Sequence, residues 1–397
     1  MAGRVNGPRS TSTESLRLRG QRGVTNSTPR EAAGGCVTDS EVLLETPLAS
    51  LHRELGGRMV PFAGYSMPVQ YPAGIMAEHL HCRAQASLFD VSHMGQAELV
   101  GEGAAAALEK LTPADVQALK PGRQRYGLLL NEAGGIVDDF MFANLGDRLF
   151  LVVNASRKHI DLPLIESVLP AGVTLRPLPD RALIALQGPA VAALVPTTLT
   201  FMGIAEIEIA GIKVLASRSG YSGEDGLEIS VPADQAEALA RALLAMPGVL
   251  PAGLGARDSL RLEAGLCLYG NDLDETTSPI EAALTWSIGK RRRTEWNFRG
   301  ADVVRDHLDN GVKRLRVGIR PEGRQPARGH TVIQKDGAVI GEVTSGGFGP
   351  TIGAPVAMGY VARDAAADGT AIDLIVRDKP LPARIAPMPF QPHRYAR

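Results

Sequence analysis

Hydrophobic positions along the chain alternate with polar ones over short distances, and turn-forming residues interrupt them often. The clearest pattern predicts a meander of three strands at 126–130, 136–144 and 149–154, with a glycine turn at 131–135. Further strands are predicted at 89–100, 182–187, 214–218 and 227–231. Helices are predicted from Thr46-Pro47, where proline suits the first helical position, and at 76–86, 103–111 and 235–245, the last capped by Asp234.

The pattern changes after about residue 300. A helix around 303–308 precedes short, regularly spaced strands, at 315–319, 331–334, 339–344, 356–361, 372–376 and 383–386. Asp336-Gly337 is a signal for a two-residue hairpin. Short strands at regular spacing predict a small barrel or sandwich. We therefore expect an α+β fold with a soft domain boundary near 295–310.

The first 44 residues differ from the rest. They contain many serines, threonines and arginines and little that could form a core. An organellar transit peptide has a similar composition, but the acidic residues Glu14, Glu31, Asp39 and Glu41 argue against one. A disordered or over-extended start fits as well. We therefore place residues 1–44 outside the fold, as a disordered or targeting extension.

The overall composition is ordinary for a globular protein. Of the 397 residues, 44% are hydrophobic and 21% are charged, and the net charge is −1 at pH 7. This balance favours neither nucleic acid nor an anionic membrane, and no apolar run approaches the roughly 18 residues of a membrane helix. The three cysteines are widely spaced and indicate neither a disulfide framework nor a zinc site. We therefore expect no nucleic acid, membrane or metal as a partner.

Two adjacent aspartates, Asp138 and Asp139, lie within the predicted strand 136–144. Neighbours on a strand face opposite sides of the sheet, so one carboxylate can meet solvent while the other points inward beside Val137 and Met141. An inward carboxylate in apolar surroundings has a raised pKa and can hold or relay a proton near neutral pH. The alternative is a solvated strand aspartate beside a turn, and the pattern alone leaves both open.

A glycine-rich loop at 220–226 leads into a strand that carries Glu228. A fixed carboxylate can accept two parallel hydrogen bonds, which suits an amino-heterocycle such as a pterin. Tyr221 in the loop offers an aromatic face and a hydroxyl group. The alternative is a tight hairpin with an exposed glutamate.

Arg257 and Arg261 are four residues apart and share one face of a helix that is expected to open near 256–258. Either guanidinium could bind a carboxylate or a ring carbonyl, or could instead form a surface pair with Asp258.

The basic run 290–293 is either a solvated face or a docking site for an acidic partner. The histidines of the first half have no metal-ligand spacing and are expected to be structural: His52, His79, His81 and His93.

These segments, in this order, resemble the aminomethyltransferase family, the T-proteins of the glycine cleavage system. The resemblance extends from about residue 46 to residue 395. It rests on the blocks 59–64, 89–94, 131–139, 185–189, 220–228, 253–272, 279–281, Trp286, 289–293, 343–346 and 388–390. The departures are modest: Tyr65 stands where many relatives have tryptophan, and 347–349 varies the block before it.

The resemblance implies a three-lobed ring. Residues 45–295 would form a folate-binding α+β region of two interleaved lobes, and 296–397 a C-terminal antiparallel β-barrel. It implies that Asp139 is catalytic, beside the reacting nitrogen of folate. The implied cofactor-binding residues are Glu228 at the pterin, Arg257, Tyr126, Asn154 and Tyr221 in the folate pocket, and Tyr395 as a late C-terminal contact.

The implied activity moves the one-carbon unit from the aminomethyl-dihydrolipoyl arm of the H-protein to tetrahydrofolate, a co-substrate. The products are 5,10-methylenetetrahydrofolate and ammonia, and the carbon leaves sulfur either as an iminium or by direct displacement. Two alternatives use the same scaffold: a folate-dependent demethylase and a non-enzymatic folate-binding iron–sulfur assembly factor. We expect a monomer that binds lipoylated H-protein, in the cytoplasm of a bacterium or the mitochondrial matrix of a eukaryote.

Overall fold

The computed structural model describes residues 42–396, so the predicted extension at 1–44 lies outside the described residues except for 42–44. None of the helices in 42–396 is long and apolar enough to cross a membrane. The helices are α1 (Ala49–Glu54), α2 (Ile75–Ala84), α3 (Ala104–Leu108), α4 (Lys158–Glu166), α5 (Val191–Leu194), α6 (Ala236–Leu244), α7 (Leu254–Glu263), α8 (Arg292–Glu295) and α9 (Ala301–Asn310).

A six-stranded sheet carries the segment with Glu228. Its strand order is β11 (Ile204–Ile209), β12 (Ile212–Ser217), β13 (Gly226–Pro232), β10 (Arg181–Gln187), β4 (Ala86–Asp90) and β14 (Val249–Pro251). One face packs against α1, α5 and α6, and the other against α2 and α7. Because β10 is covered on both faces, it reads as one continuous apolar run rather than an alternating one.

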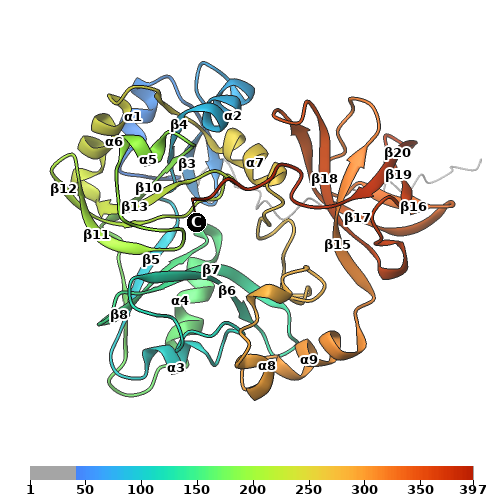
Figure 1. Cartoon of the computed structure of the whole chain (residues 1–397), viewed down its shortest axis with the longest axis horizontal. Coiled ribbons are helices and arrows are strands. Elements are labelled where there is room, and N and C mark those ends of the chain that lie inside the picture. Colours follow the sequence, from blue (N-terminus) through green and yellow to red (C-terminus); the bar gives the residue numbers. More distant parts are fainter. Residues whose placement is uncertain (1–41, 397) are drawn as a thin grey trace, which may run out of the picture. The chain divides into compact units, whose positions relative to one another are not determined.

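A five-stranded sheet carries the aspartate pair (Figure 1). Its order is β6 (Arg123–Leu130), β7 (Ile136–Asn144), β8 (Arg148–Val153), β5 (Gly95–Val100) and β9 (Thr174–Pro177). The predicted meander is confirmed as β6, β7 and β8, paired antiparallel. Helices α3 and α4 pack on one face, and on the other face the ends of β6 and β7 pack against α9 and the segment that follows α7.

The single strand predicted at 89–100 is wrong. The chain turns between β4 and β5 and enters the other sheet, so the two sheets interleave along the sequence. At this break the Asp90 carboxylate accepts hydrogen bonds from the Ser92 amide at 2.8 Å and the Thr46 hydroxyl at 2.7 Å. Thr46 is therefore not a helix cap, and α1 begins at Ala49, two residues after the predicted first helical position at Pro47.

The Asp234 cap is also wrong. A short 3-10 turn at Ala233–Gln235 precedes α6, and the helix has no side-chain cap. A smaller sheet of three strands lies within residues 44–70, and the sequence pattern did not predict it. Its order is β1 (Leu44–Glu45), β3 (Tyr65–Gln70) and β2 (Arg58–Phe62).

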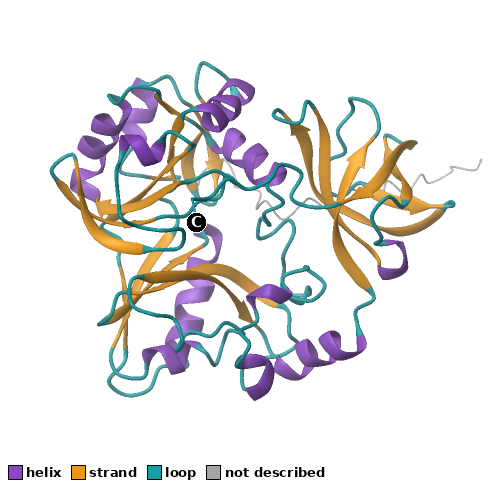
Figure 2. Cartoon of the chain, viewed as in Figure 1, coloured by secondary structure: helices purple, strands orange, loops and turns teal. Residues whose placement is uncertain are grey.

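The C-terminal segment forms the predicted barrel, which is closed and antiparallel. Its order is β15 (Arg314–Pro321), β18 (Ala354–Ala362), β17 (Ala338–Gly349), β16 (Val332–Lys335), β19 (Ala371–Val376) and β20 (Lys379–Ala386). The Asp336-Gly337 hairpin is confirmed, with φ values of +51° and +79°. Figure 2 shows strands and loops making up nearly all of the barrel, whereas helices flank the open sheets.

Gly135, directly before β7, holds this strand against the segment that follows α7. A Cβ atom at Gly135 would lie 1.8 Å from the Glu275 carbonyl oxygen. We expect Gly135→Ala to lower the free energy of unfolding by about 2 kcal/mol or more, since backbone must move to relieve the clash. Denaturant unfolding measures this, and Gly347→Ala is the control because its Cβ would meet only a side chain at 3.5 Å. Equal stability of the two variants would contradict the expectation.

Candidate functional site

Asp139 sits in the middle of β7, where it is partly buried and fixed by Asn154 at the end of β8. The Asn154 side-chain amide donates to Asp139 Oδ1 at 2.8 Å and to the Asp139 carbonyl at 3.1 Å. Burial, and then the charge of Asp138, raises the pKa of Asp139 to about 7. The raised pKa expected for the inward carboxylate is confirmed, and this group can change protonation near neutral pH.

The sequence interpretation put the inward carboxylate on the face of Val137 and Met141, which is that of Asp139, and left Asp138 to meet solvent. The structure reverses the two, because Asp139 is the partly exposed carboxylate. Asp138 is completely buried, because its face of β7 is covered by α4. The Asn154 backbone amide and side-chain amide donate to its two oxygens at 3.2 and 2.9 Å. Sequence alternation correctly put the two carboxylates on opposite faces, but it could not show that a helix covers the second face.

Arg257 is the arginine left free to bind a ligand. Within residues 42–396 its guanidinium forms no ion pair and no hydrogen bond, and it lies over the Tyr221 ring at 4.7 Å. Arg261, one turn further along α7, is buried and pairs with Asp272 and Asp258 at 2.8 Å each. The sequence could not decide which arginine binds a ligand, and the structure shows Arg261 paired within the protein.

Glu228 and Tyr221 lie beside Arg257. Burial lowers the pKa of Arg257, and the negative charge of Glu228 partly offsets this effect. One oxygen of Glu228 accepts a hydrogen bond from the Ser219 hydroxyl at 2.9 Å, and across 42–396 its other oxygen has no donor. The Tyr221 hydroxyl donates to the Cys267 carbonyl, which fixes its ring under the guanidinium.

Tyr126 and Tyr395 complete the set of predicted residues. Tyr126 lies on β6 with its hydroxyl at Asp139, and burial, then the Asp139 charge, raises its pKa well above the usual value. Its ring contacts Trp286, which is 66% exposed, with 5.4 Å between ring centroids. Tyr395 stacks on Phe201 at 4.4 Å, and burial raises its pKa to about 12.

The predicted side chains lie close enough together for their charges to act on one another. The charges of Asp139 and Arg257 both act on the Tyr221 hydroxyl, and the charge of Glu228 acts on Tyr395. This cluster draws on β7, β13, α7 and the C-terminal segment, and Figure 1 shows that segment ending near β13 and β7. The cluster contains the Asp139 carboxylate, which can change protonation near neutral pH, the Arg257 guanidinium, and the Glu228 carboxylate, one oxygen of which can accept further hydrogen bonds. Together with the aromatic rings, these groups suit a flat polar heterocycle.

Most of the other buried charge is structural. Arg83 on α2 pairs with Glu224 at 2.8 Å and with Glu263 at 3.0 Å, and Arg394 also binds Glu224. Although burial alone would raise it, the hydrogen bond from His79 holds the pKa of Glu263 at about 2. These pairs join α2, α7, the loop before β13 and the C-terminal segment, so they hold the elements around the cluster in place.

Most of the basic run 290–293 is bound within the fold, and Lys290 is the exposed member. Arg291 pairs with Glu109, Asp115 and Glu295 at 2.5–2.8 Å, and Arg292 is buried with its guanidinium on the Glu109 carbonyl at 2.7 Å.

The four histidines of the first half make contacts within the fold, as expected for structural residues. His52 bonds to Asp90, His79 to Glu263 and His81 to the Gly248 carbonyl, and His93 packs against Phe62.

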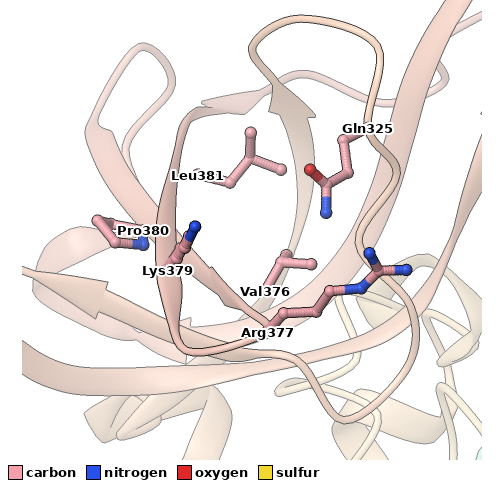
Figure 3. A pocket seen from close by; sticks show the side chains of 6 residues that line it. All are labelled: Gln325, Val376, Arg377, Lys379, Pro380 and Leu381. Carbon is pink, nitrogen blue, oxygen red and sulfur yellow. The ribbon is translucent and has the colours of Figure 1, made fainter.

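Two hollows lie away from the cluster. One of about 350 Å³ opens on the barrel at the β19–β20 hairpin, where Arg377, Lys379 and Gln325 are among the lining residues (Figure 3). Another, of about 500 Å³, lies beside α9 and includes His307 and Arg363. Neither contains a residue of the cluster, and no group of metal-ligating side chains occurs within 42–396.

Comparison with known proteins gives two matching family models. The model described as GCVT N-terminal domain matches residues 48–292, and the glycine cleavage T-protein C-terminal barrel domain matches residues 314–391. The first covers more than half of the chain. The chain belongs to the glycine cleavage T-protein family. The resemblance inferred from the sequence blocks is therefore confirmed, and aminomethyl transfer is the activity that membership of this family implies.

Individual T-protein relatives agree along nearly the whole chain. The mitochondrial aminomethyltransferase of Dictyostelium discoideum is 44% identical over 382 residues, which cover 90% of this chain and 95% of that protein. The mitochondrial aminomethyltransferase of Gallus gallus is 45% identical over 373 residues, covering 89% and 94%. The crystal structure of glycine cleavage system aminomethyltransferase T from Bartonella henselae superposes with a TM-score of 0.86 at 42% identity, covering 90% of this chain and all of that one.

Sequence reasoning missed one buried acid, Asp161 on α4, which lies behind Asp138. Both of its carboxylate oxygens are buried without a hydrogen-bond donor in the described part of the chain. The helix was not predicted because Pro163 lies within it. The burial of Asp161 could have been predicted from spacing, because it lies four residues before the buried Ile165 and so on the same helical face.

Proposed function

We propose that the protein takes an aminomethyl group from the dihydrolipoyl arm of lipoylated H-protein and passes its carbon to tetrahydrofolate. The cluster of Asp139, Arg257 and Glu228 carries this proposal. It supplies a carboxylate for an attacking nitrogen, an unpaired guanidinium for an acid or carbonyl group, and an acceptor for the amino edge of a pterin. Family membership supports the same reaction over a folate-dependent demethylase or a non-enzymatic folate-binding factor.

In this reaction the carbon loses its bonds to sulfur and to the amino nitrogen and gains bonds to two folate nitrogens. The two folate N–H protons end on the sulfur, restoring the dithiol, and on the departing ammonia. Asp139 orients the attacking nitrogen and stabilises the positive charge that develops on it. Asn154 holds the Asp139 carboxylate in place, and Arg257 and Glu228 hold the folate ring and its tail.

The partners follow from the reaction. The protein acts as a monomer on two substrates, tetrahydrofolate and the loaded H-protein, so positioning of the two should supply much of the rate. The Dictyostelium and chicken relatives are named as mitochondrial, and the solved relative comes from a bacterium. We therefore place the protein in the mitochondrial matrix if its source is eukaryotic and in the cytoplasm if it is bacterial.

The test is ammonia release from aminomethyl-loaded H-protein, measured with and without tetrahydrofolate. We expect fast release only when tetrahydrofolate is present, in equal amount with 5,10-methylenetetrahydrofolate. Unloaded H-protein is the control for background ammonia. Methyl transfer from a small amine without H-protein would support the demethylase instead, and folate binding without any turnover would support the non-enzymatic factor.

A further inference from the structure

Asp161 is buried in a way that an ionised carboxylate tolerates poorly. It is 0% exposed, and neither of its oxygens has a hydrogen-bond donor within residues 42–396. A buried carboxylate without donors is strongly disfavoured relative to its neutral, protonated form. Asp138, also 0% exposed, is its neighbour across the packed interface between α4 and β7. Within 42–396 neither acid is paired with a cation, and two neighbouring buried acids are the arrangement in which one proton is shared.

The donors decide on which acid the proton resides. Asp138 receives two hydrogen bonds, from the backbone and side-chain amides of Asn154, and these favour its ionised form. Asp161 receives none, so it holds the proton and donates it to Asp138. The Asn154 side-chain nitrogen then lies between two acceptors, Asp138 Oδ1 at 2.9 Å and Asp139 Oδ1 at 2.8 Å.

We propose that Asp161 and Asp138 share one proton, and that this buried acid pair holds the Asn154 amide against the catalytic Asp139. Asp161 is thus a positioning residue for the reaction, and two residues, Asp138 and Asn154, lie between it and Asp139. The inference rests on the proposed function for its catalytic consequence, but the shared proton itself can be observed without any turnover.

The surrounding groups are compatible with one shared proton. Burial, then the charge of Asp161, raises the pKa of Asp138, and burial raises the pKa of Asp161 as well, so the pair keeps one proton at neutral pH. Arg157 lies near Asp161, but it is bound to Glu275 at 2.6 Å and lies over the Tyr269 ring at 5.1 Å. Within 42–396 it is not within ion-pair distance of Asp161, so the proton remains necessary.

Loss of the shared proton at high pH has a specific consequence. The pair would then carry two negative charges in a buried site, and the repulsion would disturb Asn154 and add negative charge beside Asp139. Turnover should therefore fall at alkaline pH. Asp161→Asn removes this fall, because an amide donates to Asp138 as the neutral acid does but cannot ionise.

The first experiment is the pH dependence of kcat for ammonia release, from about pH 6 to about pH 10, in three variants. We expect Asp161→Val to lower kcat by about tenfold, and Asp161→Asn to stay within about threefold of wild type without the alkaline fall. Glu166→Gln, an exposed acid on the same helix, should keep the wild-type profile. Equal loss in Asp161→Asn and Asp161→Val, or an alkaline fall unchanged in Asp161→Asn, would overturn the inference.

The second experiment needs no activity. Infrared spectra at neutral pH should contain the carbonyl band of a protonated buried carboxyl group in Asp139→Asn, a background in which Asp139 cannot contribute. The band should disappear in the Asp139→Asn, Asp161→Asn double variant. Absence of the band from the single variant would overturn the shared proton, even if Asp161→Val does not fold. Presence of the band in a protein that shows no H-protein-dependent turnover would instead refute only the proposed function.

Discussion

Asp139→Asn is expected to lower turnover by about 100-fold or more while tetrahydrofolate affinity stays within about tenfold of wild type. The amide keeps the size of the carboxyl group and can still contact Asn154 and Tyr126. It cannot carry the negative charge that opposes the developing positive charge on the attacking nitrogen. The measurement is single-turnover ammonia release at saturating tetrahydrofolate, together with a separate folate titration.

The pH dependence provides an independent test of the same residue. Because burial raises the pKa of Asp139 to about 7, its ionised form accumulates as the pH rises through about 7. Wild-type kcat should therefore rise over this interval, before the alkaline fall expected from the Asp138–Asp161 pair, and the rise should be absent in Asp139→Asn. Asp147→Asn, in the turn between β7 and β8, is the matched control because its side chain is 73% exposed. Wild-type-like turnover in Asp139→Asn would remove this carboxylate from the chemistry.

Local patterns predicted the elements that depend on neighbouring residues. The β6–β7–β8 meander and the barrel strands were predictable because alternation and turn residues act over a few positions. The break between β4 and β5 was not, since at this break Asp90 bonds to Thr46, 44 residues earlier. The Thr46 and Asp234 caps failed for a related reason: Thr46 has a stronger tertiary partner, and a 3-10 turn precedes α6.

In the site too, local sequence identified the candidate residues, but it could not show which of them pair with residues far along the chain. Sequence placed Asp139, Glu228 and Arg257 among the candidates, because charge within apolar sequence stands out. It could not tell Arg257 from Arg261, since the difference lies in Asp272, which pairs only with Arg261. The basic run at 290–293 looked free for the same reason, because its acidic partners Glu109 and Asp115 lie about 180 residues earlier.

The unpaired state of Arg257 leads to the second large expected effect. Arg257→Ala should weaken tetrahydrofolate binding by about 10- to 150-fold, which corresponds to the roughly 1.5–3 kcal/mol of a hydrogen bond to a charged group. Protein stability should change little, because within 42–396 the guanidinium has no ionic partner that would be left unpaired. Glu228→Ala should also weaken binding, and it leaves the Ser219 hydroxyl to its other partner, the Ser217 hydroxyl at 3.0 Å.

A folate titration by intrinsic fluorescence, with thermal unfolding of each variant, separates binding from folding. Arg305→Ala on α9 is the matched control, since its side chain is 59% exposed and, among the described residues, forms an ion pair with Asp309 alone. Unchanged folate affinity in both Arg257→Ala and Glu228→Ala would refute the pocket. A loss confined to Arg257→Ala would place the charged tail of folate, but not its pterin edge, at this cluster. Because the two residues lie on different elements, α7 and β13, a loss in both would locate the ligand between them.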